Sequence, residues 1–311
     1  MKRAQWLWLT LSVAGVAFAG CGDDDGTPMD SGTPMDSMTG GDAGGDPECA
    51  LEGQMGACCY RQSNASQLSA PELRIAYLQL TEPAVLASPI IANILNEAVR
   101  EERFNWLIRL EGADADGDVT ITTGYGRRSE TATFAFAMGD ADPPGAGDRW
   151  DPQSIAGTLT GESVTTSSLT DVFTVPVQDD DGSVILELPL RGFRVVNATM
   201  SEDRSCIGRG ITAVRFDATS GSVETYITVE DAKMGEVNAG GITASLCNIL
   251  RGSLAAGLDD CDNDPRSEWA TPPNATCDEA GACTLGGCTA ETCNAWQVVG
   301  NFAAQGVDIT N

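Results

Sequence analysis

Cysteine content constrains the fold of this chain more than any other feature of its sequence. Eleven of the 311 residues are cysteines. In an exported chain, ten or more cysteines predict disulfide bonds, because compartments outside the cytoplasm are oxidising. Zinc binding is the weaker interpretation, since no C-x-x-C spacing occurs among them. The ten disulfide candidates are Cys49, Cys58, Cys59, Cys206, Cys247, Cys261, Cys277, Cys283, Cys288 and Cys293.

The spacing of these cysteines predicts only part of their pairing, because ten cysteines allow far too many connectivities for sequence to select one. We expect Cys206 to pair with Cys247. We expect the five cysteines near the C-terminal end to pair largely among themselves. At least one further bridge is expected to return to the Cys58–Cys59 region.

The N-terminus predicts export. Lys2 and Arg3 precede an apolar run over residues 4–19, which is too short to cross a bilayer as a mature helix. The run ends in Phe18-Ala19-Gly20-Cys21, where small residues directly precede a cysteine. Acylation of Cys21 would leave ten cysteines, an even number that can pair completely. Because this run resembles the lipobox of bacterial lipoproteins, we predict a lipoprotein signal peptide over residues 1–20 and lipidation of Cys21.

Ordinary secretory cleavage is the alternative for this segment. Ala17-Phe18-Ala19 also satisfies the A-x-A rule for cleavage after Ala19. That processing would release a free protein with an unpaired cysteine at position 21.

Residues 21–48 are predicted to be an acidic, disordered tether that follows the anchor. Residues 22–48 contain eight acidic side chains and no basic one, and GTPMDS occurs twice in tandem over residues 26–37. Such a chain has almost nothing to bury and repels itself, so we expect a solvated linker with a root-mean-square span of about 30 Å. We expect it to serve as a spacer; the acidic residues directly behind Cys21 also resemble the signals that send some bacterial lipoproteins to the cell surface.

Charge and composition exclude several classes of function. The chain has 45 acidic and 18 basic side chains, no histidine, and a formal net charge of −27. Without histidine there is no Ser-His-Asp or Cys-His catalysis and no histidine-ligated metal. The negative charge argues against nucleic acid as a partner, since nucleic-acid binding needs a basic face. The surface should instead attract cations or basic partners.

The pattern of the mature chain predicts a mainly β fold with a few helices. Apolar residues alternate with polar ones in several short segments, as half-buried strands require. We expect a hairpin joining 172–177 to 184–190, and pairing of 223–229 with 213–217. The expected strands cover residues 73–80, 105–110, 119–125, 134–138, 172–177, 184–190, 213–217 and 223–229.

Two helices are expected at the edges of these sheets. Ser88-Pro89 provides an N-cap and a proline at the first helical position of a helix near 88–103. A second apolar stripe predicts a helix near 242–254. We therefore predict sandwich-like antiparallel sheets in a β-rich domain over residues 49–257. A cysteine-rich C-terminal cap follows over residues 258–311, where the periodicity fades.

Candidate chemistry is limited. Asp260, Asp262 and Asp264 are spaced as in calcium loops, and the run Asp114-Ala115-Asp116-Gly117-Asp118 offers a second oxygen-rich turn. An exposed acidic turn is the alternative at both places. Calcium is thus the one cofactor that the sequence suggests.

Catalysis has little support in the sequence. No G-x-S-x-G, P-loop or G-x-G-x-x-G motif follows a strand. A carboxylate pair could hydrolyse glycans, and Glu187 and Glu230-Asp231 are the acids to inspect for this role. Trp150, Trp269, Trp296 and Tyr125 could instead stack on sugars if exposed, or pack in the core.

The residues Phe18-Ala19-Gly20-Cys21 and the Asp-Gly-Thr-Pro tether resemble the N-termini of bacterial lipoproteins, in particular cysteine-rich envelope lipoproteins of myxobacteria. The resemblance covers about the first 48 residues. It implies a location in the cell envelope, with a lipid anchor in the outer membrane and the domain on its periplasmic or outer side. It implies no activity.

The sequence as a whole predicts a non-catalytic binding or structural domain, with an extracellular glycan or protein as partner. A lectin-like or calcium-dependent module is the alternative, and a glycan hydrolase is third.

Overall fold

The computed structural model describes residues 69–130, 133–139, 147–178, 182–201, 204–208, 210–212, 215–216, 221–239, 242–252, 261 and 265–310. The predicted signal peptide, Cys21, the tether, Cys49, Cys58, Cys59 and the acids from Asp260 to Asp264 lie outside these residues. The chain divides into two units, Met1–Gly40 and Gly41–Asn311, and every described residue belongs to the second.

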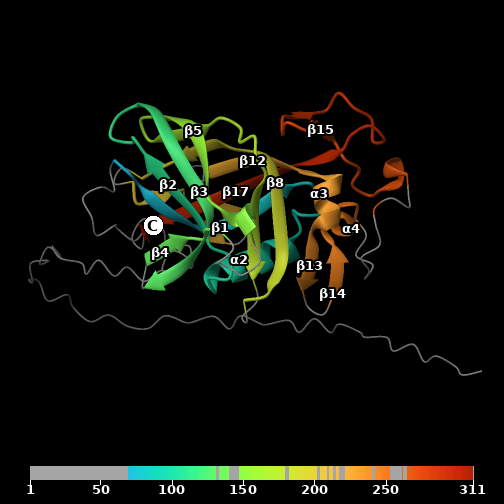
Figure 1. Cartoon of the computed structure of the whole chain (residues 1–311), viewed down its shortest axis with the longest axis horizontal. Helices are drawn as coiled ribbons and strands as arrows, with labels where there is room; N and C mark the ends of the chain where they lie inside the picture. The colour runs from blue at the N-terminus through green and yellow to red at the C-terminus, as the bar shows by residue number, and fades with distance from the viewer. Residues whose placement is uncertain are drawn as a thin grey trace, which may run out of the picture. The chain divides into compact units, whose positions relative to one another are not determined.

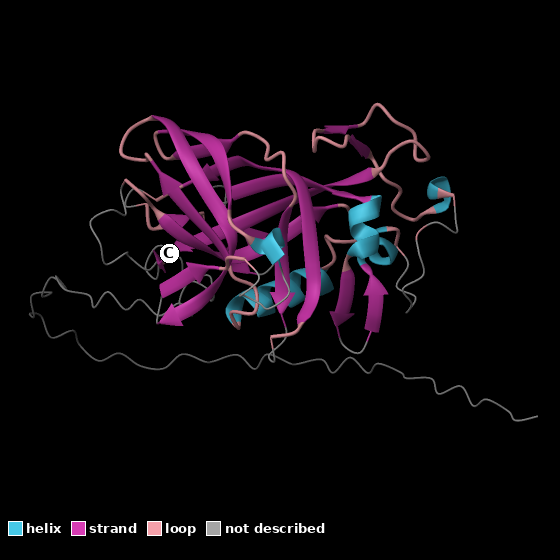
Figure 2. Ribbon diagram, in the orientation of Figure 1, coloured by secondary structure: helices cyan, strands magenta, loops and turns pink. Residues whose placement is uncertain are grey.

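Most of the described chain is antiparallel β structure, with few helices and with disulfides near the C-terminus, so the predicted fold class is confirmed (Figure 1 and Figure 2). The strands are β1 (Glu72–Glu82), β2 (Trp106–Glu111), β3 (Gly117–Glu130), β4 (Thr133–Phe136), β5 (Gln153–Thr160), β6 (Ser163–Thr166), β7 (Phe173–Gln178), β8 (Val184–Thr199), β9 (Cys206–Ile207), β10 (Gly210–Thr212), β11 (Arg215–Phe216), β12 (Gly221–Thr228), β13 (Glu236–Ala239), β14 (Ile242–Ser245), β15 (Ala275–Cys277), β16 (Cys283–Leu285), β17 (Ala295–Gly306) and β18 (Asp308–Thr310).

Strands from both ends of the described chain close into one ring. Hydrogen bonding runs in the order β8-β6-β5-β3-β2-β1-β17-β12 and returns from β12 to β8, with antiparallel pairing at every step. The packed layers that the alternating patterns predicted are opposite sides of this closed sheet. Residues 295–306, within the segment that we assigned to the C-terminal cap, form ring strand β17.

Two long strands carry the chain out of the ring. The second half of β8 lies between β6 and β12, whereas its first half pairs with β7 and β13. The first half of β3 pairs with β5, whereas its last residues pair with β4, which in turn pairs in parallel with β18. These extensions build a second layer over parts of the ring.

Large apolar side chains fill the inside of the ring. Trp106 of β2 lies opposite β8 in the strand order, and its ring centroid is 5.3 Å from that of Phe193 on β8. Phe173 of β7 contacts both rings, at 5.4 and 5.5 Å. Each such side chain contributes about 1.5–3 kcal/mol through burial. The interior is therefore a packed core.

The first helix, α2 (Pro89–Arg100), confirms the prediction for residues 88–103. The hydroxyl of Ser88 accepts a hydrogen bond from the backbone N–H of Ile91 at 3.3 Å, as an N-cap does. Leu95 and Val99 of its apolar stripe join the main core. The side chain of Asn96 bonds both backbone groups of Leu78, which fixes the helix against β1.

The second predicted helix is shorter than expected. Residues 242–245 form β14, paired with β13, and only Leu246–Leu250 are helical, as α4. The helix begins there because the Ser245 hydroxyl accepts a hydrogen bond from the backbone N–H of Asn248.

A further short helix, α3 (Val229–Met234), follows β12 and was not predicted. The hydroxyl of Thr228 caps it by accepting a hydrogen bond from the backbone N–H of Asp231. Two 3-10 helices complete the elements, η1 (Gly147–Trp150) and η2 (Arg266–Glu268).

One predicted strand pairing is wrong. Segment 213–217 was expected beside 223–229, but both edges of β12 are occupied, by β17 and by β8. A strand has only two edges, so β11 has no place on β12. It pairs with β10 instead.

The predicted hairpin of β7 and β8 is confirmed, with Gly182 in the left-handed region at φ +82°.

The disulfides confirm part of the predicted pairing. Cys277–Cys283 and Cys288–Cys293 form within the C-terminal set. The expected Cys206–Cys247 bond is wrong, because Cys247 in α4 bonds Cys261. Cys206 is also disulfide-bonded.

Candidate functional site

A shallow groove on the outer face of the ring is the candidate binding site. Its volume is about 710 Å³, and it lies over strands β3, β5 and β6 next to the β2–β3 turn. The groove is lined by Glu111, Gly112, Asp118, Val119, Thr120, Ala156, Gly157, Thr158, Thr165, Thr166 and Ser167.

Strand alternation explains why this face is polar. Val119, Ile155 and Leu159 point into the core, so the residues between them point outward. The outward positions hold the exposed side chains of Thr120 and Thr158. Thr158 pairs in register with Thr165 of β6, which places two hydroxyls side by side across the strands. The result is a hydroxyl-rich surface on rigid strands.

Two carboxylates border the groove. Glu111 ends β2 and pairs with Thr120, and Asp118 lies two residues before Thr120 on β3. Diagonal neighbours of this kind on one face are about 7–8 Å apart. Both side chains are exposed, and neither makes an ion pair within the described part of the chain. Such a surface can accept hydrogen bonds from hydroxyl or ammonium groups.

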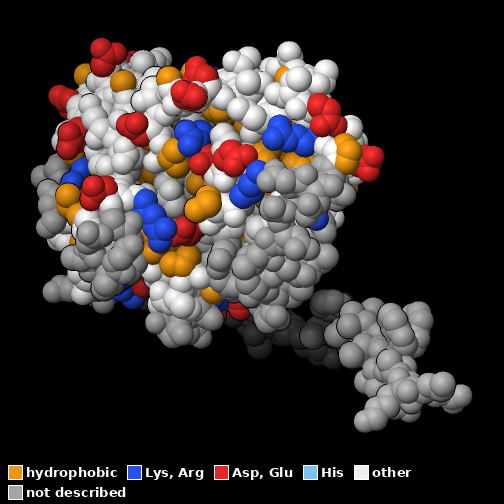
Figure 3. Space-filling model, turned by 45° about the vertical axis from the view of Figure 1, so that its right-hand side comes forward, with side chains coloured by type: hydrophobic (Ala, Val, Ile, Leu, Met, Phe, Trp, Pro, Cys, Tyr) orange, Lys and Arg blue, Asp and Glu red, His pale blue; other side chains and the backbone are white. Residues whose placement is uncertain are grey.

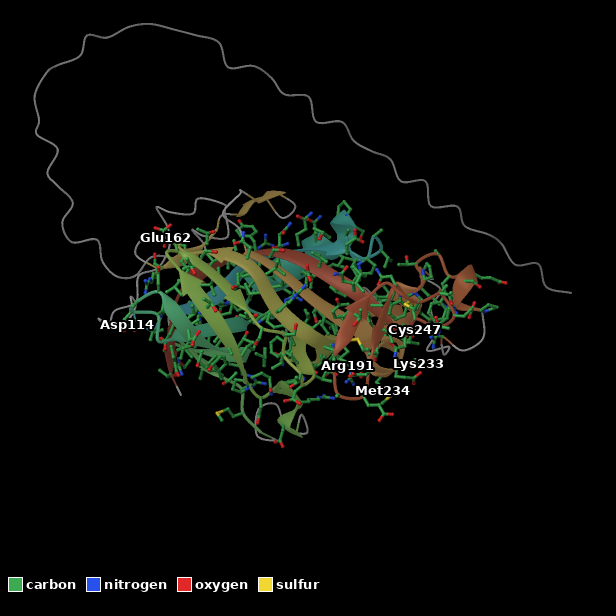
Figure 4. The ribbon with its side chains drawn as sticks, turned by 90° about the horizontal axis from the view of Figure 1, so that it is seen from above. Asp114, Glu162, Arg191, Lys233, Met234 and Cys247 are labelled. Carbon is green, nitrogen blue, oxygen red and sulfur yellow. A yellow bond between two sulfur atoms is a disulfide. The ribbon has the colours of Figure 1, made fainter. Side chains whose placement is uncertain are left out.

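The turn beside the groove contains the first predicted calcium run. Asp114, Asp116 and Asp118 are all exposed, and the carboxylate of Asp116 accepts a hydrogen bond from the backbone N–H of Gly161 at 2.8 Å. This bond links the β2–β3 turn to the β5–β6 turn, and Figure 4 shows Asp114 and Glu162 at the same end of the molecule. Within the described ranges, no group of three or more acidic or cysteine side chains converges as a metal site would require. The second run, Asp260, Asp262 and Asp264, lies outside the described residues.

The acids considered for catalysis are held by basic side chains. Glu187 is half-buried, and its carboxylate lies 2.9 Å from the guanidinium of Arg149. Glu230 bonds Lys233 at 3.0 Å. Asp231 bonds Arg191 through two hydrogen bonds, of 2.5 and 3.1 Å.

These ion pairs have a structural explanation. The hydrogen bond from Arg191 to Asp231 raises the pKa of the guanidinium above its ordinary value, and partial burial lowers it to a smaller extent. The same carboxylate bonds the hydroxyl of Thr228, the N-cap of α3. Asp231 therefore fixes the start of α3 to β8. In Figure 4, Arg191 and Lys233 lie well away from Asp114, with Lys233 further toward the other side of the molecule. Figure 3 shows basic side chains next to acidic ones near the middle of its face.

The aromatic residues proposed for sugar stacking are core residues. Trp150, Trp269, Trp296 and Tyr125 are all buried, with at most 6% of any side chain exposed. Trp269 stacks on Trp296 with centroids 5.7 Å apart, and Tyr125 meets Trp150 edge-on. The interpretation as exposed sugar platforms is therefore wrong, and the alternative of core packing is confirmed.

Comparison with known proteins gives no identification: no family model, no curated protein and no solved structure matches this chain. None of the helices in the described ranges is long and apolar enough to span a membrane.

Proposed function

We propose that the protein is a lipid-anchored component of the bacterial envelope whose closed β domain binds an extracellular partner without catalysing a reaction. The groove over β3, β5 and β6 is the single observation that carries the binding function. Its strands are fixed by the packed ring on one side, so the groove is preorganised for a ligand. The signal sequence and the acidic tether support the anchor.

A glycan is the ligand class that the groove favours. Threonine hydroxyls both donate and accept hydrogen bonds, and carboxylates accept them from sugar hydroxyls. The lining contains no aromatic ring, so recognition would depend on hydrogen bonds rather than on stacking. The lectin-like alternative therefore remains a proposal, but hydroxyl and carboxylate groups would contact the sugar, since the tryptophans first considered for this role are buried. A basic protein segment is the other partner that suits these two carboxylates, which make no ion pair within the described ranges.

Binding can be tested on a glycan array, with a tetralysine peptide immobilised on the same surface. We expect wild-type protein to give glycan signals that the double variant Glu111→Gln, Asp118→Asn loses at least tenfold. The matched control is Glu268→Gln, Glu279→Gln, which makes the same change of charge at exposed positions outside the groove. Signals on tetralysine alone would assign the groove to basic segments. No signal on either surface would contradict a binding function for the groove.

A chelator of divalent cations should have no effect on groove binding, because the lining holds no cluster of acids that converges on a cation.

The anchor is tested by intact mass of protein expressed in a bacterial host. We expect a diacyl or triacyl increment on wild-type protein and none on the Cys21→Ser variant. A mass that corresponds to cleavage after Ala19 would show a freely secreted protein and overturn the anchored function.

A further inference from the structure

A fully buried cation on β1 is held along only one edge of its guanidinium group. Arg74 is 0% exposed and lies on the face of β1 opposite to Leu73 and Ile75, which join the main core. Its Nε donates a hydrogen bond to Oδ1 of Asn105 at 2.7 Å, and its Nη2 donates one to the backbone oxygen of Val99. Both acceptors belong to α2 and to the residue before β2, so this edge of the group faces that side of β1.

The other edge of the guanidinium has no hydrogen-bond partner. In the planar fork of arginine, Nη1 lies on the edge away from the Nε–H, and it therefore points away from Asn105. β1 pairs with β2 on the side of Asn105 and with β17 on the other side. Nη1 is thus directed toward the β17 side, where it is buried without a partner among the described residues.

The residue across from Arg74 on β17 is Gln305, and its amide is unsatisfied as well. Residues that lie directly opposite in a ladder share one face, with Cβ atoms about 4.5–5.5 Å apart. Gln305 is 1% exposed, and within the described ranges neither its Nε2 nor its Oε1 has a hydrogen-bond partner. A bond from Nη1 to Oε1 would satisfy both groups, and the two side chains do not make it. Buried polar atoms nearly always have a partner, so a further species is expected to bridge the two side chains.

The charge around Arg74 indicates which species this is. No ion pair within the described ranges includes Arg74. Two charges act on it, those of Glu102 and Arg128, and Glu102 is itself ion-paired with Arg128. One negative charge therefore faces two positive charges, which leaves one positive charge in excess. Burial lowers the pKa of Arg74 to about 10, so the group is still charged at neutral pH. A buried charge without a counter-ion is strongly destabilising.

We propose that a small monovalent anion of the size of chloride binds between Arg74 and Gln305 and accepts hydrogen bonds from Nη1 and Nε2. The anion supplies the negative charge that the described chain does not place there. The oxygen and nitrogen of the glutamine amide diverge, so Nε2 can face the anion while Oε1 faces away. A water molecule can also bridge polar groups, but it leaves the positive charge uncompensated.

Binding at this position links the anion to closure of the ring. β1 begins the described chain and β17 lies near its end, so Arg74 and Gln305 meet only when these two strands pair. The unfolded chain has no such site. An anion that binds the folded state alone stabilises it increasingly as its concentration rises. Chloride should therefore contribute to stability as a specific ligand, in addition to screening the acidic surface.

Bromide can locate the ion directly, because it is close to chloride in size and scatters anomalously. We expect crystals of the protein grown in NaBr to show an anomalous peak between Nη1 of Arg74 and Nε2 of Gln305. Bromide peaks at other positions alone would overturn the proposal. An ordered water between the two side chains that bromide does not replace would overturn it as well.

Thermal unfolding at constant ionic strength provides a second measurement. Sodium chloride is compared with sodium gluconate at about 200 mM, so that screening is equal and the larger anion cannot enter the site. We expect the gain in melting temperature from gluconate to chloride to be about 3 °C larger for wild-type protein than for Gln305→Met, which lacks the amide donor. Equal gains for the two proteins would overturn the proposal.

A carboxylate built into the site should replace the anion. We expect Gln305→Glu to unfold in gluconate at the temperature of wild-type protein in chloride or above it, and to gain nothing from chloride. The matched control is Gln297→Glu, the same substitution at a half-buried position nearer the start of β17, which should keep the wild-type gain. A Gln305→Glu variant that keeps the full gain from chloride would overturn the proposal. If this variant does not fold, the comparison with Gln305→Met and the bromide peak decide.

Discussion

At the scale of single residues, Arg74 is the position that sequence patterns describe least well. It falls in an alternating strand, yet its side chain is fully buried. It donates hydrogen bonds to the side-chain Oδ1 of Asn105 and to the backbone oxygen of Val99, and it lies over the ring of Phe134. Its Nη1 has no hydrogen-bond partner among the described residues. Burial lowers the pKa of the guanidinium to about 10. The sequence could not show this, because the covering residues come from distant parts of the chain.

Substitution of Arg74 separates its packing from its charge. We expect Arg74→Ala to lower the free energy of unfolding by about 3 kcal/mol, since it leaves a cavity and unpaired acceptors. Arg74→Met should lower it by only about 1 kcal/mol, because methionine fills the stem volume and removes the cost of burying a charge. Urea unfolding at pH 7 measures both. Equal losses for the two variants would show that the hydrogen bonds of the guanidinium decide the effect.

At the scale of elements, the strands were predictable and their neighbours were not. The alternation over residues 119–125 identifies β3, because one face meets the core and the other meets water. Nothing local indicates that β12 lies between β8 and β17, since this order depends on contacts between distant segments. The end of β12 was also missed: the alternation continues to Val229, but the cap at Thr228 starts α3 there.

Gly126 marks the point where β3 leaves the ring for β4. A Cβ atom at this position would lie 2.2 Å from Cδ1 of Leu107 and 2.6 Å from the backbone oxygen of Ala135. We expect Gly126→Ala to destabilise the protein by about 2–3 kcal/mol, because the backbone oxygen cannot move without breaking the pairing of β3 with β4. Gly182→Ala is the control: its surroundings are open, and only its left-handed backbone opposes alanine, at about 1 kcal/mol. Thermal unfolding that ranks the two variants in reverse would contradict the packing argument.

The disulfides of the C-terminal region should contribute unequally. Cys247–Cys261 closes a separation of 14 residues and Cys288–Cys293 one of 5. In the chain-entropy model their removal lowers stability by about 3 and about 2 kcal/mol. Paired alanine variants, compared by guanidinium unfolding, test this order. A larger loss for the shorter loop would mean that native packing around Cys288–Cys293, rather than loop closure, determines its contribution.

At the scale of the whole molecule, closure of the ring is the feature that sequence could not supply. β1, at the start of the described chain, pairs with β17, near its end. Local patterns contain no information on such a pairing, although they predict both strands. The candidate groove depends on the order of neighbouring strands, which local patterns do not give either. Its threonines read as ordinary outward positions of strands, and only the order β3-β5-β6 gathers them beside Glu111 and Asp118. The acidic runs that the sequence emphasised contribute Asp118 alone to the lining.

The net charge of −27 should make the stability of the whole protein depend on salt. Acidic side chains repel one another in the compact state more than in the unfolded chain, and screening by salt reduces this repulsion. We expect the melting temperature to rise by about 3 °C or more between about 20 mM and 500 mM NaCl, which corresponds to roughly 1 kcal/mol. The variant Glu268→Gln, Glu279→Gln should show a smaller rise, because it carries two fewer negative charges at exposed positions. Sucrose at matched osmolality controls for effects unrelated to charge. A melting temperature that falls with NaCl would mean that the exposed ion pairs, such as Arg194 with Glu224 at 2.5 Å, stabilise the fold more than the excess of acids destabilises it.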